Sequence, residues 1–289
     1  MAHLRGVAMK TVAVATQKGG VGKTFVSCQL GFRLSGLGAP TLLLELDQQL
    51  NASDSMARGG LVACAPFTML DVFEGRAGQL PPGQLVMVPG HPDLAALERQ
   101  PERHNAFVNA LQHFLATVAG RFRVCVMDTN PSPDVRYAAA LATADFLLAP
   151  VQLNQEAIDG IATLLHHRRY GYHKVRQVLN PRLELIGILP NLVEGTPFQR
   201  ANLQQLVLHH PGLLIPVPRG DVMGYAYIPT RTAVAEAQAA GVPLWQLRQR
   251  PAGAQPVGGG TPVRSAARDA WREIKPSFDA IAARLLRED

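Results

Sequence analysis

A glycine-rich segment near the N-terminus constrains the fold of this chain more than any other stretch. Residues 18–24 read KGGVGKT, after an apolar run at residues 12–15 and before a run from Phe25 to Leu34 with helical apolar spacing. This order predicts a strand, a tight turn and a helix. Glycines let the turn curl so that its N–H groups face a phosphate chain, and the helix adds the positive end of its dipole. The segment therefore predicts a nucleotide-binding site in an α/β domain.

Two residues of this segment have defined roles in such loops. The lysine, Lys23, reaches the β- and γ-phosphates, and the hydroxyl of Thr24 binds Mg²⁺. A glycine-rich turn without a ligand is the alternative, and the order of strand, loop, Lys-Thr pair and helix argues against it. The predicted contacts to the nucleotide here are Lys18, Gly19, Gly20, Val21, Gly22, Lys23, Thr24 and Phe25.

Length and composition indicate a globular protein of one large α/β domain or a domain with appendages. The chain has 289 residues, of which 47% are hydrophobic, and no apolar run approaches the roughly 18 residues of a membrane span. Its three cysteines share no metal-like spacing, which favours a reduced, cytoplasmic compartment. Met9 directly precedes the first strand, so we expect residues 1–8 to be a dispensable extension rather than a signal peptide.

Two buried-strand patterns end in carboxylates. Residues 41–47 read TLLLELD and residues 122–128 read FRVCVMD. In a parallel α/β sheet the carboxyl ends of the strands line the ligand crevice, so Glu45, Asp47 and Asp128 are expected beside the phosphates. Asp128 is expected to bond a Mg²⁺-bound water. The alternatives are a helix cap or solvated acid for Asp47 and a metal-free strand end for Asp128.

Further apolar runs at residues 85–90, 145–151 and 183–191 complete an α/β fold, a doubly wound and mostly parallel sheet with helices on both faces. Residues 214–219 contain two prolines and are expected to form a short edge strand. Helices are predicted over residues 23–37, 67–73, 94–118 with a break at Pro101, 154–179 with a break at Gly171, and 265–289.

The glycine-rich segment resembles the deviant Walker A motif of the ParA/MinD family of ATPases. A second lysine, Lys18, opens it, and Gln17 stands where the general phosphate loop has glycine. The resemblance covers residues 10–241. It implies a P-loop fold, ATP and Mg²⁺, slow hydrolysis stimulated by a partner, and an ATP-bound homodimer in which Lys18 reaches the nucleotide of the other subunit.

Two further motifs resemble that family with substitutions. Residues 45–53, ELDQQLNAS, are similar to D-x-D-P-Q-G-N-A-[ST], which implies that Asp47 positions the attacking water. Glu45 replaces the first Asp and is expected to reach a Mg²⁺-bound water, while Gln48 replaces Pro and Leu50 replaces Gly. Residues 128–132, DTNPS, resemble D-T-P-P-S, a turn that senses the γ-phosphate, with a Pro replaced by Asn130.

The resemblance also implies a base pocket. The end of the strand at residues 183–191 corresponds to the place where the family holds adenine, so Asn191 is a candidate base contact. Pro218 and Arg219 are expected to border that pocket.

Basic residues gather in the C-terminal part of the chain. Residues 1–160 contain 12 Lys and Arg and 13 Asp and Glu, whereas residues 161–289 contain 16 and 9. This asymmetry favours a surface facing nucleic acid or anionic lipid, with scattered solvated arginines as the alternative. The candidate DNA-binding residues are Arg168, Arg169, Lys174, Arg176, Arg231, Arg264, Arg268 and Arg272.

The C-terminal segment departs most from the family. Residues 251–264 are rich in Pro and Gly and are expected to be a flexible insertion. The last helix carries an apolar stripe that either packs on the sheet or binds a membrane. Pro276 is expected to interrupt the stripe, and acidic residues dilute its positive face, so we favour packing.

The leading hypothesis is a partitioning ATPase. It implies an ATP-dependent homodimer, non-specific binding to DNA, a ParB-like centromere-binding partner, and a cytoplasmic protein associated with the nucleoid. A MinD-like membrane-cycling regulator with the same catalytic residues is the main alternative. A metabolic or reductase relative that uses ATP for chemistry is the third.

Overall fold

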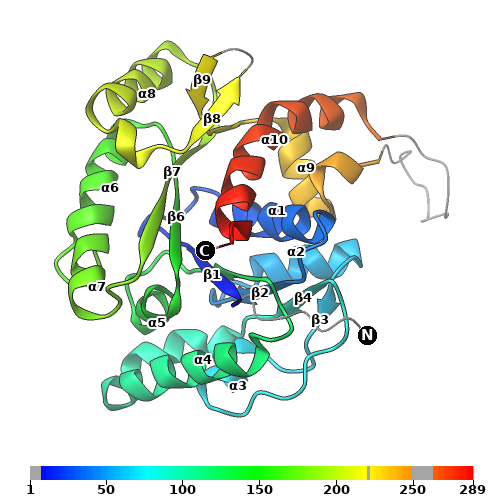
Figure 1. The fold of residues 1–289 in the computed structure, drawn as a ribbon, viewed down its shortest axis with the longest axis vertical. Coiled ribbons are helices and arrows are strands. Elements are labelled where there is room, and N and C mark those ends of the chain that lie inside the picture. The colour runs from blue at the N-terminus through cyan, green and yellow to red at the C-terminus, as the bar shows by residue number, and fades with distance from the viewer. Residues whose placement is uncertain (1–7, 220–221, 249–262, 289) are drawn as a thin grey trace.

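A sheet of eight strands in the order β10-β7-β6-β1-β5-β2-β4-β3 forms the centre of the molecule (Figure 1). Every strand pair in it is parallel. Its strands are β1 Lys10–Val14, β2 Thr41–Glu45, β3 Ala63–Cys64, β4 Leu85–Val88, β5 Val124–Asp128, β6 Phe146–Val151, β7 Glu184–Val193 and β10 Ile228–Pro229. The inner strands are near-continuous apolar runs because helices cover both of their faces.

The computed structural model describes residues 8–219, 222–248 and 263–288. Almost all of the predicted extension at residues 1–8 and of the predicted insertion at residues 251–264 lies outside the described residues. The helices are α1 Lys23–Gly36, α2 Asn51–Gly59, α3 Met69–Phe73, α4 His104–Val118, α5 Val135–Thr143, α6 Gln155–His166, α7 Tyr172–Val178, α8 Pro197–His209, α9 Thr232–Ala240 and α10 Ser265–Leu286.

Two apolar clusters pack against the sheet, one on each face. The first includes Phe107 of α4 and Leu141 of α5, and the second includes Leu30 of α1 and Phe278 of α10. Figure 1 shows α10 and α1 on one side of the strands and α4 and α5 on the other. The fold is therefore doubly wound, as predicted.

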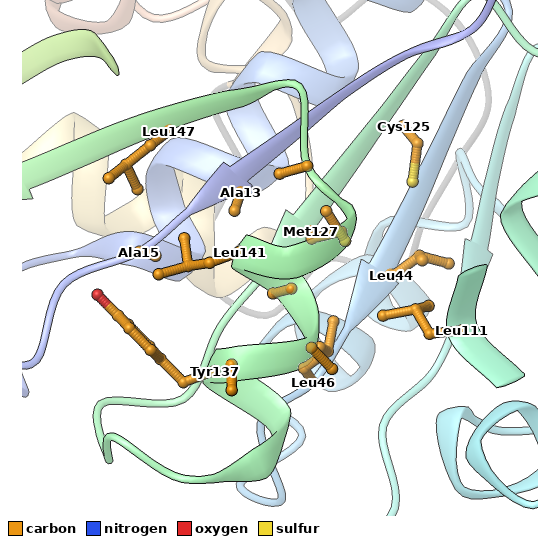
Figure 2. Packing of buried hydrophobic residues seen from close by; sticks show 14 of the residues in the cluster. Ala13, Ala15, Leu44, Leu46, Leu111, Cys125, Met127, Tyr137, Leu141 and Leu147 are labelled. Carbon is orange, nitrogen blue, oxygen red and sulfur yellow. The ribbon is translucent and has the colours of Figure 1, made fainter. Parts of the chain in front are cut away.

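The helix α5 closes the first cluster over the central strands. Figure 2 shows Tyr137 and Leu141 directed from α5 toward Ala13 on β1 and Ala15 just after it. These alanines leave room for the ring of Tyr137, which is fully buried. The helix is thereby fixed next to the loop that follows β1.

The last helix packs on the sheet through its apolar stripe. Ile274, Phe278, Ile281 and Leu285 of α10 are buried, and Trp271 lies with its ring centroid 4.4 Å from that of Trp245. Pro276 was expected to interrupt the stripe, but α10 continues through it. None of the described helices is both long and apolar enough to span a membrane.

The short edge strand predicted at residues 214–219 forms, but outside the main sheet. β8 Pro216–Arg219 pairs antiparallel with β9 Val222–Tyr225 in a separate hairpin. Leu214 forms a parallel bridge to Ile188 of the main sheet. The helices α2, α5, α8 and α9 were not predicted from the sequence. The breaks expected at Pro101 and Gly171 are confirmed, because α4 begins after a 3-10 turn at Pro101–Arg103 and Gly171 separates α6 from α7.

The helix α2 packs backbone to backbone on α9. A Cβ on Gly59 would stand 1.8 Å from the carbonyl oxygen of Gly241, and a Cβ on Gly241 would stand 1.7 Å from that of Ser55. Ser55 and Arg58 donate hydrogen bonds to carbonyls at the end of α9. Because no side chain fits between them, the C-terminal end of α2 is held firmly on α9.

Candidate nucleotide-binding site

The glycine-rich loop, Glu45, Asp47 and Asp128 meet at the carboxyl edge of the central strands. Val14 of β1 is in register with Asp128 of β5, and Asp128 is in register with Glu45 of β2. Since β1 lies between β5 and β6, the glycine-rich loop that follows β1 opens over the middle of this edge.

The glycine-rich loop is held by the end of β7. Gly22 has a φ of 81°, and a Cβ there would stand 2.3 Å from Nδ2 of Asn191. Asn191 Nδ2 donates to the carbonyl oxygen of Val21 at 2.7 Å. The structure thus places Asn191 against the loop backbone, while its predicted contact with a base is still a prediction. Pro218 lies exposed on the separate β8–β9 hairpin.

Lys23 is buried in the loop. Its Nζ donates to the carbonyl oxygen of Lys18 at 3.0 Å. Burial lowers the pKa of Lys23, and the nearby carboxylates of Asp128 and Asp47 oppose that shift. The ammonium group is therefore a desolvated cation in need of an anion. Lys18 Nζ donates to Oδ1 of Asn154 at 3.4 Å.

Asp128 lies buried beneath the first turn of α1. Its Oδ1 accepts a hydrogen bond from the Ser27 hydroxyl at 2.9 Å, and the Thr24 side chain also bonds to it. Its Oδ2 is buried without a hydrogen-bond partner. Burial, together with the charge of Glu45, raises the pKa of Asp128 to about 7.

The raised pKa of Asp128 makes the stability of the ligand-free protein depend on pH. The folded state keeps the carboxyl proton up to about pH 7, whereas the unfolded chain releases it near 3.8. The free energy of unfolding therefore falls as pH rises through this interval and then levels off. Between pH 5 and pH 8, we expect the wild type to lose about 2 kcal/mol more than Asp128→Asn. Urea unfolding without nucleotide or magnesium measures this, and equal losses in both proteins would contradict it.

Glu45 caps the helix α2. Its carboxylate accepts hydrogen bonds from the backbone N–H groups of Ala52 at 2.7 Å, Ser53 at 3.1 Å and Gly90 at 3.2 Å, and from the Ser53 hydroxyl. A carboxylate at a helix N-terminus is stabilised by the free N–H groups there. These contacts assign Glu45 to the helix cap and give no support to its predicted role near Mg²⁺.

Leu50, which replaces a family glycine, adopts the left-handed conformation with φ 59° and ψ 22°. A residue with a Cβ is destabilised by about 1 kcal/mol there, whereas glycine is not. We expect Leu50→Gly to be about 1 kcal/mol more stable than Leu50→Ala in chemical denaturation. The matched control is Ala57→Gly on the exposed face of α2, where glycine should lose about 1 kcal/mol relative to alanine. The expectation is contradicted if glycine is more stable than alanine at both positions, or less stable than alanine at both.

Asp47 lies just beyond β2 and is almost fully buried. Its Oδ1 accepts a hydrogen bond from the backbone N–H of Gln49 at 3.0 Å, which orients the carboxylate. Its charge acts on Lys23. Asp47 therefore shares one site with the glycine-rich loop, as predicted.

A buried arginine that was not predicted from the sequence joins the segments after β2 and β5. Arg136 of α5 donates from Nη2 to Oδ2 of Asp134 at 2.5 Å and from Nη1 to the carbonyl oxygen of Leu46 at 3.4 Å. Nη1 also donates to Oε1 of Gln48. Asp134 caps α5 by accepting from the backbone N–H of Arg136 at 3.0 Å. A helix cap at Asp134 was the only local signal that could have marked this group.

The residues at this edge fit a nucleotide with Mg²⁺. Two buried side-chain atoms at this edge, Asp128 Oδ2 and Asn130 Oδ1, have no hydrogen-bond partner in the described part of the chain. Buried polar atoms are normally paired, so these are places where a ligand or water belongs. A carboxylate and a hydroxyl, from Asp128 and Thr24, match the oxygen donors that hydrated Mg²⁺ prefers.

The candidate DNA-binding residues fall into two separate groups. Arg168, Arg169, Lys174 and Arg176 are exposed at the α6–α7 corner. Arg231, Arg264, Arg268 and Arg272 lie at α9 and the start of α10, away from that corner (Figure 1). The second group is partly neutralised, because Arg231 pairs with Glu273, Arg264 with Glu236 and Arg272 with Asp269. No ion pair of the first group is formed with an acid in the described part of the chain.

Comparison with known proteins places these features in a family. Residues 9–185 match the family described as an AAA domain. Protein IncC of Escherichia coli is 28% identical over 289 residues, which covers 96% of this chain and 70% of IncC. The chromosome partitioning protein ParA of Caulobacter vibrioides is 29% identical over 258 residues, covering 86% of this chain and 90% of ParA.

A solved structure shares the fold as well as part of the sequence. Cobyrinic acid a,c-diamide synthase from Mycobacterium smegmatis, with a bound ATP analog and magnesium, superimposes with a TM-score of 0.65 at 27% identity. The match covers 81% of this chain and 91% of the synthase.

Proposed function

The chain belongs to the AAA domain family, in its ParA/MinD group of deviant Walker A ATPases, and from this premise we propose that it is an ATP-hydrolysing DNA-partitioning protein. One observation carries the proposal: a buried, desolvated Lys23 lies beside a buried Asp128 with an unpaired oxygen, at the mouth of a glycine-rich loop. The name of ParA, which matches 86% of the chain, supports partitioning. The synthase, which matches 81% of the chain, makes a metabolic role the alternative.

We assign the following tasks to the chain's own residues. The loop N–H groups and Lys23 bind the phosphates, and Thr24 and Asp128 hold Mg²⁺, the latter through water. Bound Mg²⁺ supplies charge neutralisation at the phosphates. Asp47 orients the attacking water, and Lys23 stabilises the charge that develops in the transition state. The backbone N–H of Gln49 orients the Asp47 carboxylate, and the Glu45 carboxylate caps the N-terminus of α2.

The deviant lysine supports a dimer. Lys18 opens the loop, and we propose that it reaches the nucleotide of a second copy, so that ATP closes the dimer and hydrolysis opens it. Slow turnover, stimulated by a ParB-like partner, is part of the same proposal. The whole described chain then acts as one ATPase domain in the cytoplasm, on the nucleoid.

We propose that the α6–α7 corner carries the DNA contact. Its cations are exposed and have no acidic partner in the described residues, whereas most of the α9–α10 group is already paired. A cation without a carboxylate partner gains most from a phosphate and releases counterions on binding.

Binding to non-specific duplex DNA with ATP, with ADP and without nucleotide, across a salt series, tests this function. We expect tight binding only with ATP, weakened steeply by salt. Replacing Arg168, Arg169 and Lys174 by alanine should reduce the salt slope by about 0.9 for each phosphate that is no longer neutralised. The matched control replaces Arg231 and Arg272. No DNA binding in any nucleotide state at low salt, with ATPase activity present, would favour the membrane-cycling alternative.

A further inference from the structure

We propose that Arg136 is a positioning residue for ATP hydrolysis, which fixes the segment that carries Asp47 relative to the turn after β5. This inference rests on the proposed function of Asp47. Arg136 lies on α5, outside the phosphate loop, and its guanidinium group donates hydrogen bonds to the residues on both sides of Asp47.

The contacts of Arg136 surround Asp47 without touching its carboxylate. One guanidinium nitrogen, Nη1, donates to the carbonyl oxygen of Leu46 and to the side chain of Gln48. The other two, Nε at 3.1 Å and Nη2 at 2.5 Å, donate to Asp134 Oδ2. The side chain of Arg136 is only 3% exposed. A planar, buried fork of this kind holds a fixed geometry that a flexible surface lysine does not.

The same group extends to the turn after β5. Asn130 Nδ2 donates to Asp134 Oδ2 at 2.9 Å and to the carbonyl oxygen of Ser132 at 3.1 Å. Because both partners are hydrogen-bond acceptors, the amide group of Asn130 must be oriented with its nitrogen toward them. Oδ1 is left as a buried acceptor without a partner, two residues beyond Asp128. A continuous hydrogen-bonded chain therefore runs from Gln48 through Arg136 and Asp134 to Asn130.

This chain connects the two segments that border the expected γ-phosphate position. Asp134 Oδ2 accepts from both Asn130 and Arg136, so displacement of the turn after β5 shifts the carboxylate that orients Arg136. Displacement of Arg136 in turn releases Leu46 and Gln48. The position of Asp47 thus depends, through these contacts, on the position of the turn after β5.

Steady-state kinetics of Gln48→Ala, Arg136→Lys and the double variant test this role. Gln48 is half-buried, so its replacement removes one hydrogen bond and leaves the buried ion pair intact. We expect each single variant to lower kcat about tenfold with the Kd for ATP unchanged within threefold, because misplacement of a positioned group affects the chemical step. The double variant should be no slower than Arg136→Lys, because both changes break the same hydrogen bond. Gln112→Ala, an exposed glutamine on α4 that takes part in none of these contacts, is the matched control and should leave kcat unchanged.

Amide hydrogen exchange of the nucleotide-free protein gives a second measurement that does not depend on activity. Arg136→Lys should speed exchange in residues 46–50 and 129–134 together, by at least fivefold, and leave the strands unchanged. Unchanged kcat in both single variants, additive losses in the double variant, or faster exchange across the whole chain would each overturn the proposal. A wild-type protein without ATPase activity would overturn the proposed function, whereas the exchange result would still report on the coupling of the two segments.

Discussion

Replacing Lys23 by alanine is expected to abolish ATP binding, with a loss of affinity of roughly 100-fold or more. Lys23 is a buried cation whose Nζ donates to an uncharged acceptor of its own loop, the Lys18 carbonyl. Phosphate oxygens would supply the negative charge that the Lys18 carbonyl acceptor lacks. Titration with a fluorescent ATP analogue measures the affinity, and Lys275→Ala, on the exposed face of α10, is the control.

The stability of Lys23→Ala separates loss of the ligand interaction from loss of the fold. Burial lowers the pKa of Lys23, which means that the charged form is disfavoured in the folded state. Removing it should therefore leave the Tm of the nucleotide-free protein unchanged or raise it. A protein that retains wild-type affinity for ATP would exclude Lys23 as the phosphate ligand.

Replacing Asp47 by alanine should reduce kcat by about 100-fold or more and leave ATP affinity intact. The carboxylate is oriented by the N–H of Gln49 and lies beside the loop, whereas the Lys23 and Asn191 side chains donate to the loop carbonyls. Its loss should remove the water-orienting step and preserve phosphate binding. The protein would then accumulate in its ATP state and remain on DNA.

Single-turnover hydrolysis and DNA dissociation kinetics, followed on the same sample, measure both effects of Asp47→Ala. Asp54→Ala is the matched control, because Asp54 is an exposed acid in the first turn of α2, seven residues further along. Normal turnover of Asp47→Ala would assign the water to another group. Loss of ATP binding together with turnover would instead assign Asp47 a structural role in the loop.

The sequence predicted the parts of the site whose chemistry is local. The phosphate loop, Asp47 and Asp128 all lie at strand ends, and the period of apolar residues locates strand ends well. The eight-strand order was not predictable, because β1 pairs with strands more than 100 residues later. The short edge strand at residues 214–219 was predicted, but its partner β9 was not, because β9 is a short run that carries little pattern of its own.

Glu45 and Arg136 show why the rest was missed. A glutamate in place of an aspartate lengthens the side chain by one methylene, and only the structure shows that Ala52, Ser53 and Gly90 lie within its reach. Gly90 comes from a segment 45 residues away in the sequence. In the sequence, Arg136 looks like an ordinary helical residue. Its partners Leu46 and Gln48 lie just after β2, far away in the sequence, so their contact with Arg136 was not predictable.

The position of β1 also determines when the protein can be assembled during synthesis. Its neighbours, β5 and β6, end at Asp128 and Val151, so a growing chain that has made the glycine-rich loop has no strand to pair with it. Pairings between distant segments form slowly and leave apolar strands exposed in the meantime. We therefore expect apolar strands of the nascent chain to stay exposed until residue 151 has been made. The glycine-rich loop is thus translated early, but we expect it to become structured only once β5 and β6 can pair with β1.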